Sequence, residues 1–231
     1  SQRASGGASG GRGRESQTES GTERAPPGGA AHRHEARSRP IPPHPSPPPP
    51  SSERSKMPAY TSTLNEMSVP QVCGMSVLPI KTSIRGPAPQ ARDGEEDIID
   101  EAIKFFRANI LFASFDVHGG ADRALLYLTL YISQCLKRME KAGNKASGNK
   151  ILFELAKEKF PMPGESGWPL GGHILRAQSR DEDEKARAYL KQLREETGIR
   201  MLEVLYAEDE SAPNKFWMGF SKHKFMNILV R

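Results

Sequence analysis

Hydrophobic residues at helical spacing predict a first helix over residues 95–113. Its apolar positions recur every three or four residues and would form one stripe: Ile99, Ala102, Ile103, Phe106 and Ile110. Asp93 is placed to cap this helix, because a short side chain with an acceptor oxygen can bind the free N–H groups of the first turn. The stripe predicts a helix that packs one face on a core and leaves the other in water.

Residues 121–142 predict a second helix with a different pattern, because its apolar residues occupy most of the circumference. They are Leu125, Leu126, Leu128, Tyr131, Ile132, Cys135, Leu136 and Met139. A helix that is apolar nearly all round belongs at the centre of a bundle. Gly143 follows the last apolar residue of this pattern and is placed to supply a left-handed C-terminal cap.

Two further helices are predicted downstream. The third covers residues 147–159 and would face the core with these positions: Ile151, Leu152 and Leu155. The fourth begins at Ser179, which forms a capping-box pattern with Glu182, and is expected to end at Gly198. Its buried stripe would consist of Ala186, Tyr189, Leu190 and Leu193. Residues 199–206 fit either a helix or a strand, and their helical neighbours favour a helix.

The last segment, residues 214–229, is predicted to be a fifth helix and combines aromatic residues with cations. Trp, Phe and Met beside Lys can anchor a protein interface, so part of this segment is a candidate partner-binding site. The candidate residues are Phe216, Trp217, Phe220, Lys222 and Lys224. The pattern is equally compatible with the alternative that the aromatic residues belong to the core beneath basic neighbours.

A proline- and glycine-rich stretch, residues 161–173, predicts a rigid loop between the third and fourth helices. Its glycines match neither a phosphate-binding loop nor a dinucleotide fingerprint. Trp168 lies in this loop and is a further interface candidate, since it either holds the loop on the core or meets a partner. The sequence leaves these two roles open.

Together these patterns predict an all-α domain over residues 95–231, with about five helices of roughly 10 to 20 residues and one central helix surrounded by the others. Residues 57–94 carry scattered apolar residues among prolines and glycines and predict an extended arm. The arm would be pinned to the core at Val77, Leu78 and Ile80. Residues 1–56 are nearly devoid of large apolar residues and rich in proline, glycine and arginine, so we expect a disordered leader. We interpret this leader as translated upstream sequence, with Met57 as the natural start.

The net charge of +5 is a poor argument for nucleic-acid binding, because most of it lies in the leader. Residues 1–56 hold nine basic and five acidic residues, a net charge of +4, which leaves residues 57–231 with +1. Of the two cysteines, Cys135 falls among the core positions, and neither belongs to a metal-ligand pattern. No catalytic constellation is visible. We therefore expect a non-enzymatic cytosolic protein without a cofactor, a metal or a membrane span.

Several motifs, in their order along the chain, resemble a known family. They are Met57-Pro-Ala-Tyr, Leu78-Pro-Ile, Gly86-Pro-Ala-Pro, Asp100-Glu-Ala-Ile, the run from Ala121 to Ser133, Phe160-Pro-Met-Pro-Gly-Glu, the run from Arg187 to Gly198, Lys215-Phe-Trp and Phe225-Met-Asn. This ordered set resembles subunit 3 of the Arp2/3 complex, the 21-kDa type, over nearly all of residues 57–227. The chain departs from the family at Phe216, where a second Trp usually stands beside Trp217, so only Trp217 is carried over as a family contact candidate.

The resemblance implies a five-helix fold around one central helix and a non-catalytic role in the nucleation of branched actin filaments. It implies two kinds of partner: the other Arp2/3 complex subunits, especially the third actin-related protein, and the mother actin filament. It also implies a place in the cytoplasm with the actin cytoskeleton, and no cofactor, because nucleotide binding belongs to the actin-related subunits. Two alternatives from other classes remain, a free-standing helical adaptor and a weak RNA-binding protein that uses Lys222 and Lys224.

Overall fold

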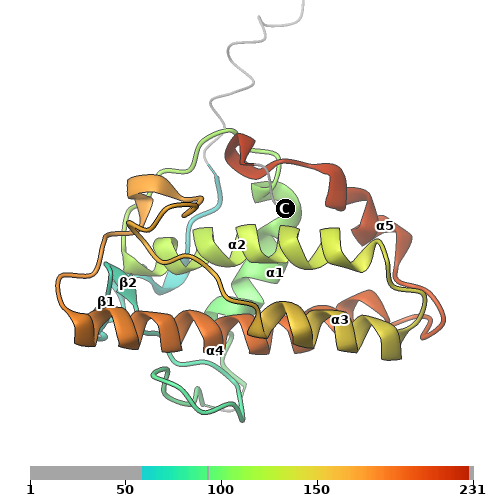
Figure 1. Ribbon diagram of the computed structural model, residues 1–231, viewed down its shortest axis with the longest axis horizontal. Helices are drawn as coiled ribbons and strands as arrows, with labels where there is room; N and C mark the ends of the chain where they lie inside the picture. Colours follow the sequence, from blue (N-terminus) through green and yellow to red (C-terminus); the bar gives the residue numbers. More distant parts are fainter. Residues whose placement is uncertain (1–58, 93, 229–231) are drawn as a thin grey trace, which may run out of the picture. The chain divides into compact units, whose positions relative to one another are not determined.

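The computed structural model describes residues 59–92 and 94–228, which are mostly helical (Figure 1). The described α-helices are α1 (Ile98–Asn109), α2 (Gly120–Met139), α3 (Lys145–Lys157), α4 (Arg180–Leu205) and α5 (Lys215–Met218). The remaining regular elements are an antiparallel hairpin, β1 (Gln71–Val72) and β2 (Met75–Ser76), and the 3-10 segments η2 (Thr63–Glu66), η3 (Gly171–His173), η4 (Gly219–Lys222) and η5 (Phe225–Asn227). The predicted mostly helical fold with about five helices is confirmed, whereas the predicted leader, residues 1–56, lies outside the described residues.

Helix α2 is the centre of the domain, as its all-round apolarity predicted. Sixteen of its 20 residues are buried, and it contacts α1, α3, α4 and the hairpin (Figure 1). Two of its buried polar side chains are satisfied within the helix, since the hydroxyl of Thr129 donates to the Leu125 carbonyl and that of Ser133 to the Thr129 carbonyl. In the part of the chain that is described, no helix combines the length and apolarity needed to cross a bilayer.

The fourth helix is longer than predicted, because α4 continues through Gly198 to Leu205. The expectation that Gly198 ends this helix was wrong, and the preference for a helix over residues 199–206 was right. Helix α3 packs along α4, and a Cβ atom at position 198 would lie 3.7 Å from the Cβ atom of Leu152 on α3. This glycine therefore lies where the two helices approach each other closely, and it does not cap a helix.

Two predicted caps differ from the structure. Gly143 does not adopt the left-handed conformation that its proposed cap requires, so that prediction was wrong. Asp93 lies outside the described residues, and the observed cap of α1 is Asp97, which accepts hydrogen bonds from the N–H groups of Ile99 and Asp100. A capping box of Asp97 with Asp100 therefore starts α1 later than the apolar pattern predicted.

The capping box predicted for α4 forms only by half. The Ser179 hydroxyl accepts the Glu182 N–H at 3.1 Å, but the Glu182 carboxylate does not return to Ser179. It accepts instead the N–H groups of Gln178 and Cys73, both at 2.7 Å. The glutamate therefore ties the start of α4 to the hairpin, where Cys73 adopts a φ of 51°.

The arm before α1 is held both by apolar side chains and by buried carboxylates. Its predicted apolar contacts, Val77, Leu78 and Ile80, are buried. The polar contacts were not predicted: Glu101 on α1 accepts hydrogen bonds from Ser62 and Thr63, and Asp122 on α2 accepts the N–H of Ser62 at 2.7 Å. These carboxylates compensate their own burial by binding the arm.

The last segment is not the long helix that was predicted for residues 214–229. Helix α5 has four residues, and the 3-10 segments η4 and η5 follow it. Met226 and Asn227 have positive φ angles of 50° and 60°, which a right-handed helix excludes. The segment therefore lies over α1 and α2 as a series of short turns. Helix α4, with 26 residues, is by contrast longer than the predicted helices.

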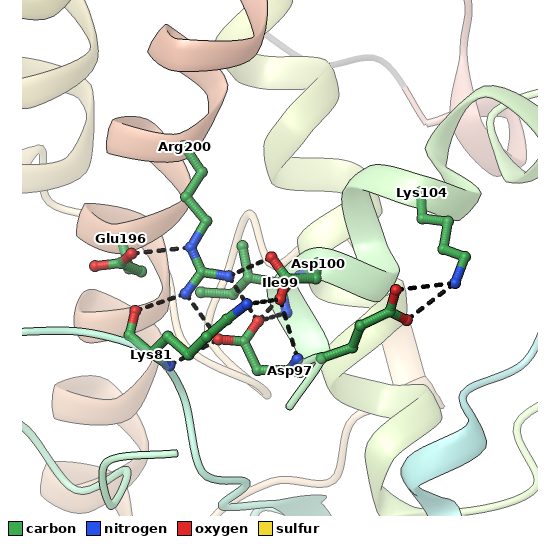
Figure 2. Close-up of polar contacts among 8 residues, drawn as sticks. Lys81, Asp97, Ile99, Asp100, Lys104, Glu196 and Arg200 are labelled. Carbon is green, nitrogen blue, oxygen red and sulfur yellow. Dashed lines mark hydrogen bonds and ion pairs between the residues drawn. The ribbon is translucent and has the colours of Figure 1, made fainter. Parts of the chain in front are cut away.

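An ion cluster around Arg200 joins the arm, α1 and α4 (Figure 2). Its guanidinium donates to both carboxylate oxygens of Asp97 at 2.7 Å, to Asp100 at 2.8 Å, to Glu196 at 2.9 Å and to the Lys81 carbonyl at 2.7 Å. These contacts use all five N–H groups that an arginine side chain offers. Asp97 in turn accepts the Lys81 N–H at 2.7 Å, so one carboxylate binds all three segments.

The charges of this cluster stabilise each other against burial. Burial by itself would raise the pKa of Asp97, but hydrogen bonds from Arg200 and from the N–H groups of Lys81 and Asp100 lower it below its ordinary value of 3.8. Burial likewise opposes the charge of Arg200, but its hydrogen bonds and ion pair with Asp97 raise its pKa. Both groups are therefore charged at neutral pH.

Asp97→Asn is expected to make the free energy of unfolding less dependent on pH in the acidic range. Because the folded-state pKa of Asp97 is lowered, its charge stabilises the fold above its unfolded pKa of 3.8, and this contribution is lost as the pH falls below that value. Asparagine keeps an acceptor for the α1 cap but loses the ion pair. We expect the variant to lose roughly 2 kcal/mol in the free energy of unfolding near neutral pH, and its difference from the parent protein to become smaller below about pH 4. Both values are measured by urea denaturation.

The control is Glu203→Gln, which neutralises an exposed carboxylate on α4, the helix that carries Arg200. It should change the free energy of unfolding by less than about 0.5 kcal/mol at each pH. A difference between Asp97→Asn and the parent protein that is constant from acid to neutral pH would contradict the role given to this charge.

Candidate partner-binding surface

Three segments of the chain bring aromatic and cationic side chains together around one hollow. The hollow has a volume of about 470 Å³, and we call it the aromatic hollow. It is lined by Tyr60 from the arm, Lys104, Phe105, Arg107 and Ala108 from α1, and Phe216 from α5. Of the predicted interface candidates, the hollow therefore includes Phe216 directly.

Tyr60 is positioned by the end of α1. Its N–H donates to the Asn109 side chain at 2.8 Å, and the Asn109 amide donates back to the Tyr60 carbonyl at 3.0 Å. Its ring stacks on Phe105 with the ring centres 5.4 Å apart. Because Asn109 is fully buried, it fixes the backbone of Tyr60 while the tyrosine ring stays 54% exposed.

Phe216 is held from two sides although its side chain is largely open to solvent. Arg107 lies over the rings of both Phe216 and Trp217, at 5.3 and 5.9 Å from their centres. Phe220 meets Phe216 edge to face at 5.7 Å, and Trp217 stacks on Phe106 of α1 at 5.9 Å. These contacts orient the Phe216 ring, which remains 60% exposed.

The other predicted candidates divide into three groups. Trp217 and Phe220 are partly buried beneath the hollow, where both contact Phe106. Lys222 and Lys224 are exposed but do not line the hollow. Trp168 lies elsewhere, stacked on Tyr127 of α2 at 6.0 Å.

The core alternative holds fully for Phe225 and in part for Trp217 and Phe220, which pack against the core. Phe225 is fully buried, whereas Phe216 is among the most exposed large apolar residues of the described chain. The segment is therefore a mixture, with one end in the core and the other at the surface.

Sequence reasoning missed Tyr60, Phe105 and Arg107. Phe105 did carry a signal, because an aromatic residue off the buried stripe of an amphipathic helix has no core to fill. Tyr60 carried none, because its position depends on a hydrogen-bond partner 49 residues away. Arg107 carried no signal either, because only the folded structure places the rings of Phe216 and Trp217 beside it.

The chemistry of this surface is that of binding. Aromatic residues and arginine are enriched among the residues that anchor protein interfaces, and lysine is more common at the rim. Among residues 59–92 and 94–228, no three His, Cys, Asp or Glu side chains form a group that could hold a metal ion. Cys135 is buried on α2, as its position predicted, and burial raises the pKa of its thiol to about 12. That thiol stays protonated and is a core residue.

Comparisons with known proteins agree on one family. The family described as P21-Arc, the ARP2/3 complex ARPC3 (21 kDa) subunit, matches residues 57–229. The chain is 47% identical over 171 residues to actin-related protein 2/3 complex subunit 3 of Arabidopsis thaliana, which covers 74% of the chain and 98% of that relative. The Dictyostelium discoideum subunit is 46% identical over 73% of the chain and 97% of its own length, and that of Schizosaccharomyces pombe 43% over 74% and 98%.

Alanine substitution should separate the exposed from the supporting residues of the hollow. Phe216→Ala is expected to change the free energy of unfolding by less than about 0.5 kcal/mol, because most of the ring already contacts water. Trp217→Ala is expected to cost about 2 kcal/mol, because it removes the ring that stacks on Phe106. Both values come from chemical denaturation, and equal losses would mean that Phe216 serves the fold rather than a partner.

Proposed function

The chain belongs to the family of the 21-kDa subunit of the Arp2/3 complex, and from that membership we propose how it supports the nucleation of branched actin filaments. It is a non-catalytic structural subunit, so its contribution is made through contacts with neighbouring subunits. Its place of action follows from the complex, which puts the chain in the cytoplasm with the actin cytoskeleton.

The aromatic hollow is the surface that docks on the third actin-related protein. The observation that carries this assignment is the Phe216 ring, 60% exposed yet oriented by Arg107 and Phe220. A side chain that is already held in place loses little conformational entropy on binding, so more of its buried area contributes to affinity. Trp217, the family contact candidate, shares the Arg107 guanidinium with this ring.

The surrounding charges suit a protein partner. Lys104 pairs with Glu96 at 2.9 Å, which leaves the rim of the hollow polar while its centre stays aromatic. An apolar centre with a polar rim is the usual arrangement of a protein interface. The docking keeps this subunit in the complex, and the assembled complex contacts the mother filament.

A free-standing helical adaptor is the weaker alternative. It predicts a monomer without a sizeable exposed apolar patch. Tyr60 and Phe216, more than half exposed, both line one hollow, which favours a surface that is covered in an assembly.

Phe216→Ala should weaken the binding of the subunit to the third actin-related protein without unfolding the subunit. We expect a loss of affinity of about tenfold or more, as for a central interface anchor. The chain is co-expressed with the other subunits and purified through a tag on itself, and the third actin-related protein is quantified after washes of increasing stringency.

The matched control is Phe153→Ala on α3. Phe153 is 57% exposed and lies under the Lys157 ammonium at 3.7 Å, so both its exposure and its cationic neighbour resemble those of Phe216. It should leave recovery unchanged. Full recovery with Phe216→Ala would count against the docking assignment.

A further inference from the structure

A second cavity lies against the central helix and shares no lining residue with the aromatic hollow. Its volume is about 820 Å³, within the range of ligand-binding pockets. Its lining includes Tyr127 and Tyr131 of α2, Phe160 and Trp168 of the loop between α3 and α4, and Arg194 of α4. We call it the arginine cavity.

Arg194 is a buried cation without a carboxylate partner in the described chain. Its residue is 3% exposed, and its guanidinium lies between the rings of Tyr131 and Phe160, 4.6 Å from each centre. One N–H group donates to the Leu155 carbonyl. The rings and this carbonyl offset part of the cost of burying the charge, but a buried arginine is normally paired with an anion.

Three more polar groups in the same wall lack a partner among the described residues. The hydroxyls of Tyr127 and Tyr131, the indole N–H of Trp168 and the Nε–H of Arg194 all remain without a hydrogen bond. Burial raises the pKa of both tyrosines and outweighs the nearby Arg194 guanidinium, which acts on each pKa in the opposite direction, so their hydroxyls stay protonated and can donate. Since buried polar groups are nearly always paired, four donors around one cavity indicate an acceptor that arrives from outside the chain.

The mouth of the cavity adds to its preference for an anion. Lys159 lies at the lining, and the acidic residue there, Glu165, is already engaged by Arg187 at 3.2 Å and by the Met162 N–H at 2.9 Å. The four donors are covered from solvent, so an entering group must displace part of the wall. Trp168, which is only partly buried and lies on a loop, is the lining residue that we expect to move.

We propose that the arginine cavity binds a carboxylate side chain of an extended segment from a neighbouring polypeptide. A small anion would satisfy Arg194 but would leave the aromatic walls in contact with water. An acidic residue with apolar neighbours provides both an acceptor and apolar cover, because its carboxylate reaches the donors while the adjacent side chains cover the rings. The site is independent of the docking surface, so either assignment can fail without the other.

The two tryptophans of the full chain provide the test, because each gives one indole N–H resonance. The probes are two libraries of acetylated pentapeptide amides, with apolar residues around a central glutamate or a central glutamine. The glutamate library should shift the Trp168 resonance and saturate at a concentration about tenfold or more below that of the glutamine library. The Trp217 resonance should stay in place.

Variants assign the effect to the cavity. Arg194→Gln should remove the difference between the libraries. Because that variant can fail to fold, Tyr127→Phe is the second variant. It should raise the half-saturating concentration of the glutamate library about three- to tenfold. Its melting temperature should not fall, since the lost hydroxyl has no partner among the described residues. Arg180→Gln, at a side chain of α4 that is 90% exposed, should bind like the parent protein.

Three results would overturn the proposal. One is equal binding of the two libraries, and another is the absence of any Trp168 response. The third is a lower melting temperature for Tyr127→Phe, which would show that its hydroxyl already has a partner within the fold.

Discussion

The bond between Arg200 and Asp97 is the interaction on which the placement of the other segments depends. Asp97 caps α1, binds the backbone of the arm at Lys81 and pairs with α4 (Figure 2). The position of α1 then determines where Asn109 holds Tyr60 and where Arg107 meets the last segment. A carboxylate in the interior thus sets the geometry of a surface.

Two arginines of α4, the buried Arg194 and the partly buried Arg200, differ in how completely they are paired. Arg200 has an acceptor for every N–H group, whereas Arg194 has two aromatic rings and one carbonyl. A fully paired arginine locks elements together, and its carboxylates come from the chain itself. An arginine without a carboxylate beside an 820 Å³ cavity is instead suited to an anion supplied by another molecule.

The helices were predictable from sequence where burial has a simple period. Helix α2 is apolar around its axis, and this alone identified it as the central element. The glycine signals misled, because Gly198 lies at a helix–helix contact and Gly143 keeps an ordinary backbone conformation. A local rule for helix ends cannot distinguish these uses, since only the packed structure says what approaches a glycine.

The candidate surface was predictable only in part, for a similar reason. Phe216 and Trp217 stood out because aromatic residues and lysines are consecutive there. Tyr60 did not, because Asn109 and Phe105 position it across a long stretch of sequence. The segment's helical pattern was also broken by positive φ angles at its end, at Met226 and Asn227, which no periodicity reveals.

Site-specific photo-crosslinking tests most directly whether the aromatic hollow faces the third actin-related protein. A crosslinking phenylalanine analogue is placed at Phe216 in one preparation of the assembled complex and at Phe153 in another, since the two side chains are similarly exposed in the subunit. We expect a crosslink from position 216 to the third actin-related protein and none from position 153. A crosslink to that protein from position 153 alone would contradict this expectation.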